Sequence, residues 1–64
     1  MNTFKTGDKV RYIPPHANGY FFHKDCEEGV VSSVDDHYVF VYYMRNGILQ
    51  QTAAATNPKN LVHI

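Results

Sequence analysis

The chain has little cysteine, no tryptophan and no excess of charge of either sign. Cys26 is the single cysteine among 64 residues, so an internal disulfide cannot form. Secreted domains of this size usually carry several disulfides. The sequence also shows no basic start followed by an apolar segment, and no apolar run near the roughly eighteen residues of a membrane-spanning helix. These absences predict a cytoplasmic protein without membrane contact.

The balance of charge narrows the class of partner. Six basic residues face six acidic residues, so the net charge at pH 7 is zero. Binding to duplex DNA or to an anionic membrane depends on Lys and Arg neutralising phosphates, and this composition argues against it. Single-stranded nucleic acid is not excluded as a partner, because its bases can stack on aromatic side chains and the chain has five tyrosines and four phenylalanines.

Residues 29–44 organise the rest of the chain. β-branched and aromatic side chains, which suit a pleated and half-buried surface, fill two arms around Asp35-Asp36. Asp favours turns, so this stretch predicts a β-hairpin. In the second arm, 37–44, successive side chains point to opposite faces, and both sets are largely apolar. We therefore expect a central strand of a small barrel, within a single domain that covers 1–64.

Four further elements are predicted around this hairpin. Thr6-Gly7-Asp8-Lys9 is a turn that opens a strand over 9–13, with Val10 and Tyr12 pointing inward, and Pro14-Pro15 ends it. Asn46-Gly47 predicts a tight hairpin turn into a fourth strand over 48–55. A short helical turn follows, capped by Thr56 or Asn57 with Pro58 in its first position. The last strand covers 61–64, and Leu61 is expected to plug the barrel.

This order of elements resembles the SH3-like small barrels, especially their Tudor and KOW-like members. Four segments carry the resemblance: Gly7-Asp8-Lys9-Val10, Glu28-Gly29-Val30-Val31, Val39-Phe40-Val41-Tyr42-Tyr43 and Asn57-Pro58-Lys59-Asn60-Leu61. The chain is also similar to small bacterial and phage-encoded SH3-like proteins of unassigned function, through Pro14-Pro15-His16, His23 and Asp25-Cys26-Glu27. The resemblance implies an all-β, five-stranded SH3-like barrel with one short 3-10 turn before the last strand. It also implies a phage or prophage origin, and it implies no reaction.

A long loop over 14–28 holds the candidate metal ligands. Two imidazoles and a thiolate, from His16, His23 and Cys26, are a reasonable set for zinc, and Asp25, Glu27 or another histidine could complete four ligands. A metal would also stabilise a small core. The spacing matches no standard zinc finger or ribbon. The alternative is a packed Cys26 with two surface histidines, because free cysteine is among the most buried residue types.

Three consecutive aromatics in the same loop are the candidate partner-binding residues. Tyr20, Phe21 and Phe22 cannot all point the same way in extended chain, so at least one is expected to be exposed. Aromatic residues dominate interface hot spots, and Arg11 and Arg45 are expected on the polar rim. The alternative is that two of the three aromatics close the end of the barrel, since a single exposed apolar residue needs no explanation.

Two other groupings define rival binding functions. One is an aromatic cage that binds a methylated cation, as in Tudor-like domains. The alternative is that these aromatic rings only pack in the core or on neighbouring strands. The residues concerned are Tyr12, Tyr38, Phe40, Tyr42 and Tyr43. The other is a basic face that binds single-stranded nucleic acid. The alternative is that these basic side chains form an ordinary solvated surface. The residues concerned are Lys9, Arg11, Lys24, Arg45 and Lys59.

Catalysis has little support in the sequence. A Cys26–His23 pair lacks an oxyanion hole, and Asp35 and Asp36 are turn residues rather than an acid/base pair. No phosphate-binding glycine loop or metalloprotease motif is present. We therefore expect a non-enzymatic binding module that contacts another protein, or a copy of itself, through the long first loop. Nucleic acid binding and a zinc-stabilised interaction module are the alternatives.

Overall fold

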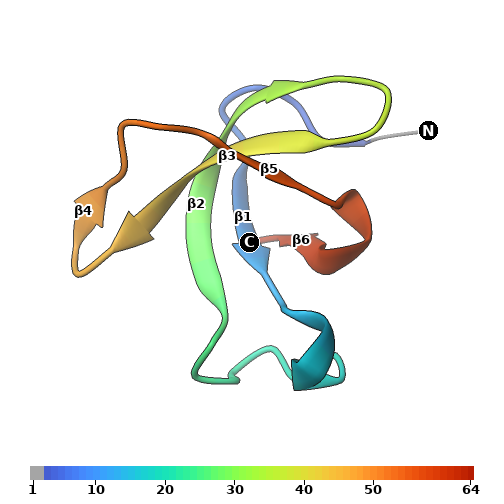
Figure 1. Cartoon of the computed structure of the whole chain (residues 1–64), viewed down its shortest axis with the longest axis vertical. Helices are drawn as coiled ribbons and strands as arrows, with labels where there is room; N and C mark the ends of the chain where they lie inside the picture. The colour runs from blue at the N-terminus through green and yellow to red at the C-terminus, as the bar shows by residue number, and fades with distance from the viewer. Residues whose placement is uncertain (1–2) are drawn as a thin grey trace.

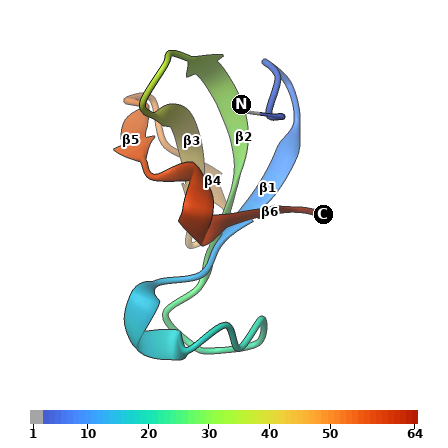
Figure 2. The same ribbon diagram turned by 90° about the vertical axis from the view of Figure 1, so that its right-hand side faces the viewer.

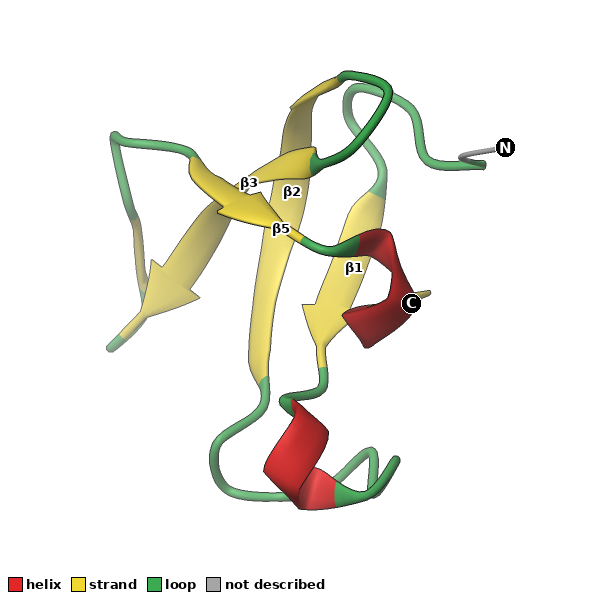
Figure 3. Cartoon of the chain, turned by 45° about the vertical axis from the view of Figure 1, so that its right-hand side comes forward, coloured by secondary structure: helices red, strands yellow, loops and turns green. Residues whose placement is uncertain are grey.

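The computed structural model describes residues 3–64, and these residues form an all-β domain without an α-helix (Figure 1). The two short red segments in Figure 3 are 3-10 turns. The strands are β1 (Lys9–Tyr12), β2 (Glu27–Val34), β3 (Val39–Arg45), β4 (Ile48–Leu49), β5 (Ala54–Thr56) and β6 (Leu61–His63), and the turns are η1 (Pro15–Ala17) and η2 (Pro58–Asn60). None of the described segments is a helix with the length and hydropathy needed to span a bilayer.

All strand pairs are antiparallel and belong to one open sheet. The strand order is β4-β3-β2-β1-β6, and β5 also pairs with β3. Residues 39–41 pair with β2 on one edge of β3 and with β5 on the other, so β3 is the central strand. The chain returns through η2 to place β6 against β1. The predicted all-β class is therefore confirmed, and the central strand predicted over 37–44 is present as β3 with shifted ends.

The predicted hairpin between β2 and β3 is present, with different ends. The Asp35 carboxylate accepts hydrogen bonds from the backbone N–H groups of His37 and Tyr38, at 2.8 and 2.7 Å. These bonds lower the pKa of Asp35 and keep residues 37 and 38 in the turn. Consequently β3 begins at Val39 instead of 37, while β2 extends back to Glu27.

A glycine allows the two long strands to approach closely. Gly29 lies opposite Tyr43 on β3 and opposite Val10 on β1. A Cβ at this position would collide with the backbone oxygen of Tyr42 and with the Val41 side chain. A glycine within a strand often marks such a close approach of backbones. This position therefore accepts no larger residue without movement of β3.

The prediction of one strand over 48–55 is wrong, because two short strands stand in its place. The Asn46-Gly47 turn is confirmed, with φ of 53° and 76°. Beyond it, Tyr42 and Tyr43 of β3 face four residues of the returning chain, 50–53. Because four residues face two, part of this segment leaves the ladder and interrupts pairing. Residues 50–53 line a cavity of about 570 Å³ beside Ile48 and Leu49.

The core is a small apolar cluster on one face of the sheet. Alternation along β3 is confirmed: Val39, Val41 and Tyr43 are buried, while Phe40 and Tyr42 are half-buried on the opposite face. Tyr12 packs against the cluster as predicted. Among residues 3–64, the buried members of this cluster are Val10, Val31, Val39, Val41, Tyr43 and Leu61.

The C-terminal elements close the core as predicted. Asn57 caps η2 by accepting a hydrogen bond from the Lys59 N–H at 3.0 Å, and Pro58 occupies the first position. This turn directs Leu61 into the core and Val62 to the surface. A long loop over 13–26 lies at the bottom of the molecule in both Figure 1 and Figure 2, at the opposite end from the turn between β2 and β3.

Candidate functional site

The loop over 13–26 is a succession of hydrogen-bonded turns. Backbone N–H groups bond to the carbonyl three residues earlier at Ala17 to Pro14, Tyr20 to Ala17, His23 to Tyr20 and Cys26 to His23, over 2.9–3.1 Å. Asn18 and Gly19 reverse the chain after η1 with φ of 51° and 79°. The loop therefore has a defined backbone although it belongs to no sheet. Loops of this length in compact domains are usually functional or disordered, and this one is ordered.

Arg11 on β1 fixes the middle of this loop. Its Nε donates to the carbonyl oxygen of Phe21 at 2.8 Å, and the guanidinium lies 4.8 Å from the centre of the Phe21 ring. The same guanidinium forms an ion pair of 2.7 Å with Glu28. Only 16% of the Arg11 side chain is exposed. The predicted rim residue is therefore a structural support for the loop, and its charge is already paired.

The other two aromatics of the triplet point to solvent. Tyr20 and Phe22 are 60% and 73% exposed, whereas Phe21 is half-buried. Both the Tyr20 and Phe21 rings make edge contacts with Phe22, with centroids 6.3 and 5.0 Å apart. The expectation that at least one aromatic is exposed is confirmed. Together, Tyr20 and Phe22 form an exposed aromatic pair on an ordered backbone.

Arg45, the second predicted rim residue, lies at the end of β3. Its Nε donates to Glu27 at 2.8 Å, and this partner raises the pKa of Arg45. Two consecutive glutamates at the start of β2 therefore pair with two arginines on different strands. In the predicted basic face, the two arginine charges are both paired with carboxylates.

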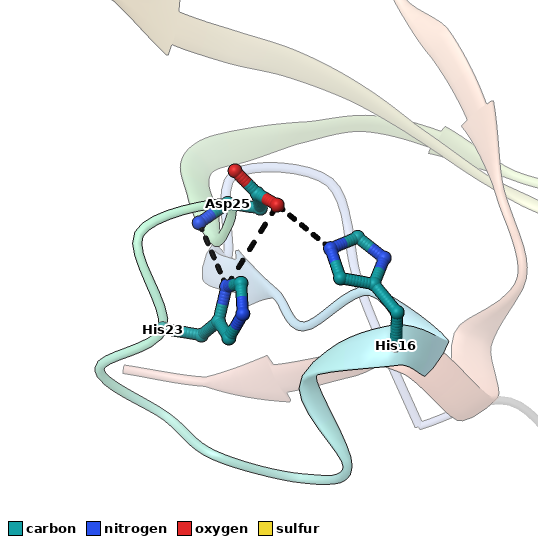
Figure 4. A group of neighbouring side chains, drawn as sticks. All are labelled: His16, His23 and Asp25. Atoms are coloured by element: carbon teal, nitrogen blue, oxygen red, sulfur yellow. Dashed lines mark hydrogen bonds and ion pairs between the residues drawn. The ribbon is translucent and has the colours of Figure 1, made fainter.

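The predicted metal ligands are only partly brought together (Figure 4). His16 Nε2 lies 2.7 Å from Asp25 Oδ2, and His23 Nδ1 lies 3.9 Å from the same oxygen. The hydrogen bond with His16 is the main cause that lowers the pKa of Asp25. Cys26 is not in this group: its thiol donates to the carbonyl of Tyr20 at 3.5 Å. From the sequence, Asp25 was expected only as a possible fourth ligand. Its position two residues after His23 matches no standard metal-binding motif, so the spacing did not single it out.

Four of the five aromatics of the predicted cage are divided between two faces of the sheet, and Tyr38 lies in the turn before β3. Tyr12 and Tyr43 meet edge to face on the core side, with ring centres 6.2 Å apart. The Tyr43 hydroxyl bonds to Thr56 Oγ1 at 2.6 Å, and burial raises its pKa. Phe40 and Tyr42 lie on the opposite face, where side chains alternate with the buried ones. The structure therefore does not gather these five rings around one point.

Two features of the site were missed in the sequence. One is η1, which Pro14-Pro15 could have indicated, because proline is favoured in the first position of a helical turn. The other is the cavity beside β4, which is lined by residues 50–53. It forms because β4 and β5 pair with β3 in different registers, and local sequence does not reveal this difference. Comparison of the chain with protein-family models, with curated proteins and with solved structures gives no match.

Proposed function

We propose that this chain is a non-enzymatic binding module that contacts a protein partner through the loop over 13–26. Tyr20 and Phe22 are the anchors. The observation that carries the proposal is their high exposure on a backbone held by successive turns and by Arg11. A cytoplasmic location accords with the single free thiol of Cys26.

The order of the loop makes it a favourable binding element. Ordering a flexible segment on association costs free energy, and a segment that is already ordered avoids most of this cost. Aromatic side chains bury a large area with few rotatable bonds, which is why they are frequent among interface hot spots. Burial of Tyr20 and Phe22 within a polar ring that includes Lys24 would give modest affinity at a standard interface.

The charges favour a protein over nucleic acid. Backbone phosphates bind lysine and arginine side chains whose charges are free to neutralise them. Arg11 and Arg45 are both paired with glutamates at 2.7 and 2.8 Å. A nucleic acid would have to compete with these carboxylates.

The proposal extends to the fold. If the interrupted pair β4 and β5 is counted as one strand, the chain has five strands in the order expected of an SH3-like barrel, with η2 before the last. The pairing of β6 with β1 and of β5 with β3 supports this assignment. In such a barrel, the loop over 13–26 connects the first two strands.

Capture from the native host cell tests the function. The bait is the full chain, the loop variant is Tyr20→Ser with Phe22→Ser, and the matched control is Tyr38→Ser with Ile48→Ser, which removes two exposed apolar side chains elsewhere. We expect a protein retained by the wild type and the control but lost from the loop variant, unaffected by nuclease or salt. Equal retention by the loop variant would overturn the proposal. Loss of retention after nuclease treatment would replace it with nucleic acid binding.

Self-association is the form of the proposal in which the partner is a second copy. Sedimentation of the purified chain across a concentration series distinguishes it. A dimer that dissociates in the loop variant and persists in the control identifies the copy as partner. A wild type that stays monomeric assigns the site to a different protein.

A further inference from the structure

We propose that His16, His23 and Asp25 form a binding site for a divalent transition metal of the zinc class. The ligand atoms are Nε2 of His16, Nδ1 of His23 and Oδ2 of Asp25, drawn in Figure 4. The inference does not depend on the proposed protein-binding function, because it uses different side chains of the loop.

The three atoms are close to the spacing that a metal requires. Nε2 and Nδ1 lie 2.7 and 3.9 Å from Oδ2, and all three atoms lie within 4.8 Å of one another. Zinc bonds of about 2.0–2.2 Å in a tetrahedron place neighbouring ligand atoms roughly 3.3 Å apart. The 2.7 Å distance must therefore lengthen, and the wider separations must shorten. Because His23 is half-buried while His16 and Asp25 are exposed, rotation of the two exposed side chains would make most of this change.

A metal would replace two hydrogen bonds of the cluster. The backbone N–H of Asp25 donates to His23 Nδ1 at 3.0 Å, so this nitrogen is the unprotonated one of the ring, and its lone pair must turn from the Asp25 N–H to the metal. Between His16 Nε2 and Asp25 Oδ2, at 2.7 Å, one proton is shared. Metal binding commonly displaces such protons, because ligands must be deprotonated. A cation between these groups would take the position of that proton.

The backbone that carries the ligands is already fixed. His16 lies within η1, between the buried residues Pro14 and Ala17. His23 N–H bonds to the Tyr20 carbonyl, and the His23 carbonyl accepts from Cys26 N–H. A metal would link η1 to the turn at residues 23–25. In a domain of this size, such a link adds stability that the small core supplies only in part.

The donor set selects the class of ion. Two imidazoles and one carboxylate suit zinc, cobalt and nickel, whereas calcium and magnesium prefer oxygen ligands alone. The His16 and Asp25 side chains are 62% and 48% exposed, so water can reach the fourth position. The Cys26 thiol bonds to the carbonyl of Tyr20 and stays outside the set.

Metal titration of the purified full chain tests the site. The probes are zinc chloride, followed by native mass and by the melting temperature, and cobalt chloride, followed by visible absorption. We expect one zinc per chain, a higher melting temperature, and a cobalt spectrum without a thiolate charge-transfer band. His16→Gln, His23→Gln and Asp25→Asn should each weaken zinc binding about tenfold or more, since even supporting partners of ligands contribute about 10–100-fold. His37→Gln is the matched control and should bind as the wild type does.

Several results would overturn the inference. The first is a wild type whose mass and melting temperature do not change with zinc. The second is zinc binding that is unchanged in the His16 and His23 variants. The third is a thiolate band in the cobalt spectrum of the wild type together with loss of zinc binding in Cys26→Ser. If a ligand variant fails to fold, zinc-induced shifts of the His16 and His23 ring signals in the wild-type NMR spectrum decide instead. Shifts confined to His37 or His63 would contradict the assignment. Partner capture in the presence of chelator remains a separate test of the protein-binding function.

Discussion

The sheet and the loop over 13–26 are ordered by different interactions. Four valines with no more than 1% of their surface exposed form most of the core, where apolar burial is the main stabilising term. In the loop, backbone turns, the Arg11 contacts and the His16–Asp25 pair hold the chain, while Phe22 stays in water. Apolar residues thus differ between the two regions: Val41 is buried and stabilises the fold, whereas Phe22 is exposed and is one of the anchors that we propose for a partner.

This difference predicts which region tolerates substitution. A domain of this size has little stability to spare, so any loss in the valine cluster threatens the whole fold. Surface side chains of the loop can change with little effect on the free energy of unfolding. Mutations can therefore separate stability from recognition.

The largest effect is expected from a charge in the core. Val41→Asp or Val39→Asp would place an unpaired carboxylate at a position with no solvent exposure, at a cost of several kcal/mol, comparable to the total stability. Both variants should be unfolded by circular dichroism and by NMR dispersion. Ser33→Asp, at an exposed position of β2, is the control and should stay folded. A folded Val41→Asp would show that our assignment of the core face is wrong.

Next in size is removal of the residue that closes the core. Leu61→Ala should lower the free energy of unfolding by about 2–5 kcal/mol, because the removed atoms leave a cavity. Val62→Ala, one residue later on the exposed face, should cost much less. Urea denaturation of the pair measures the difference. Equal losses would mean that β6 does not seal the core.

A smaller and local effect is expected for the arginine that supports the loop. Arg11→Met keeps an apolar stem but removes the bonds to Phe21 and Glu28, at a cost of about 1–2 kcal/mol. Amide exchange should accelerate in residues 13–26 more than in β3. Arg45→Met, whose partner Glu27 lies at the base of the loop, is the comparison variant and should leave loop exchange nearly unchanged. Uniform acceleration over the whole chain would contradict a separately ordered loop.

The smallest effect is expected from acid, through Asp8. Its carboxylate accepts the Lys5 N–H at 2.9 Å and lies 3.1 Å from His63 Nε2, and these contacts lower its pKa below 3.8. Because the pKa is lower in the folded state, this stabilisation is present above pH 3.8 and disappears as the pH falls through the folded-state pKa. Asp8→Asn should melt lower than the wild type at neutral pH and lose less on acidification. A parallel pH dependence of both melting temperatures would exclude this role of Asp8.

The hairpin of β2 and β3 could be predicted because local rules determine it. Alternation along residues 39–43 and the preference of Asp35 for a turn act within a few residues. The same holds for η2, where Asn57 and Pro58 specify the turn. Strand ends were less predictable, since the Asp35 carboxylate holds His37 and Tyr38 in the turn although Tyr38 has good strand propensity.

The break between β4 and β5 could not be predicted from local sequence. It depends on the register of two separate segments against β3, which differ by two residues. Residues 48–55 contain no proline or glycine that would mark the interruption. Only the pairing partner determines where the extra residues leave the ladder.

The site was predictable in composition but not in geometry. The triplet at 20–22 consists of similar residues, and Arg11, ten positions away from Phe21, decides which ring packs inward. Likewise, the turn at residues 23–26 directs the Cys26 thiol to Tyr20 and brings Asp25 to His16. Sequence spacing alone could not choose between the carboxylate and the thiolate.

Amide hydrogen exchange of the wild-type chain, resolved by residue, tests most directly whether the loop is an ordered binding element. The account predicts slowed exchange at the N–H groups of Ala17, Tyr20, His23 and Cys26, which close the successive turns. It also predicts that the Tyr20→Ser, Phe22→Ser variant keeps this protection. Exchange of these four amides at the rate of an unstructured peptide, with β3 still protected, would contradict it.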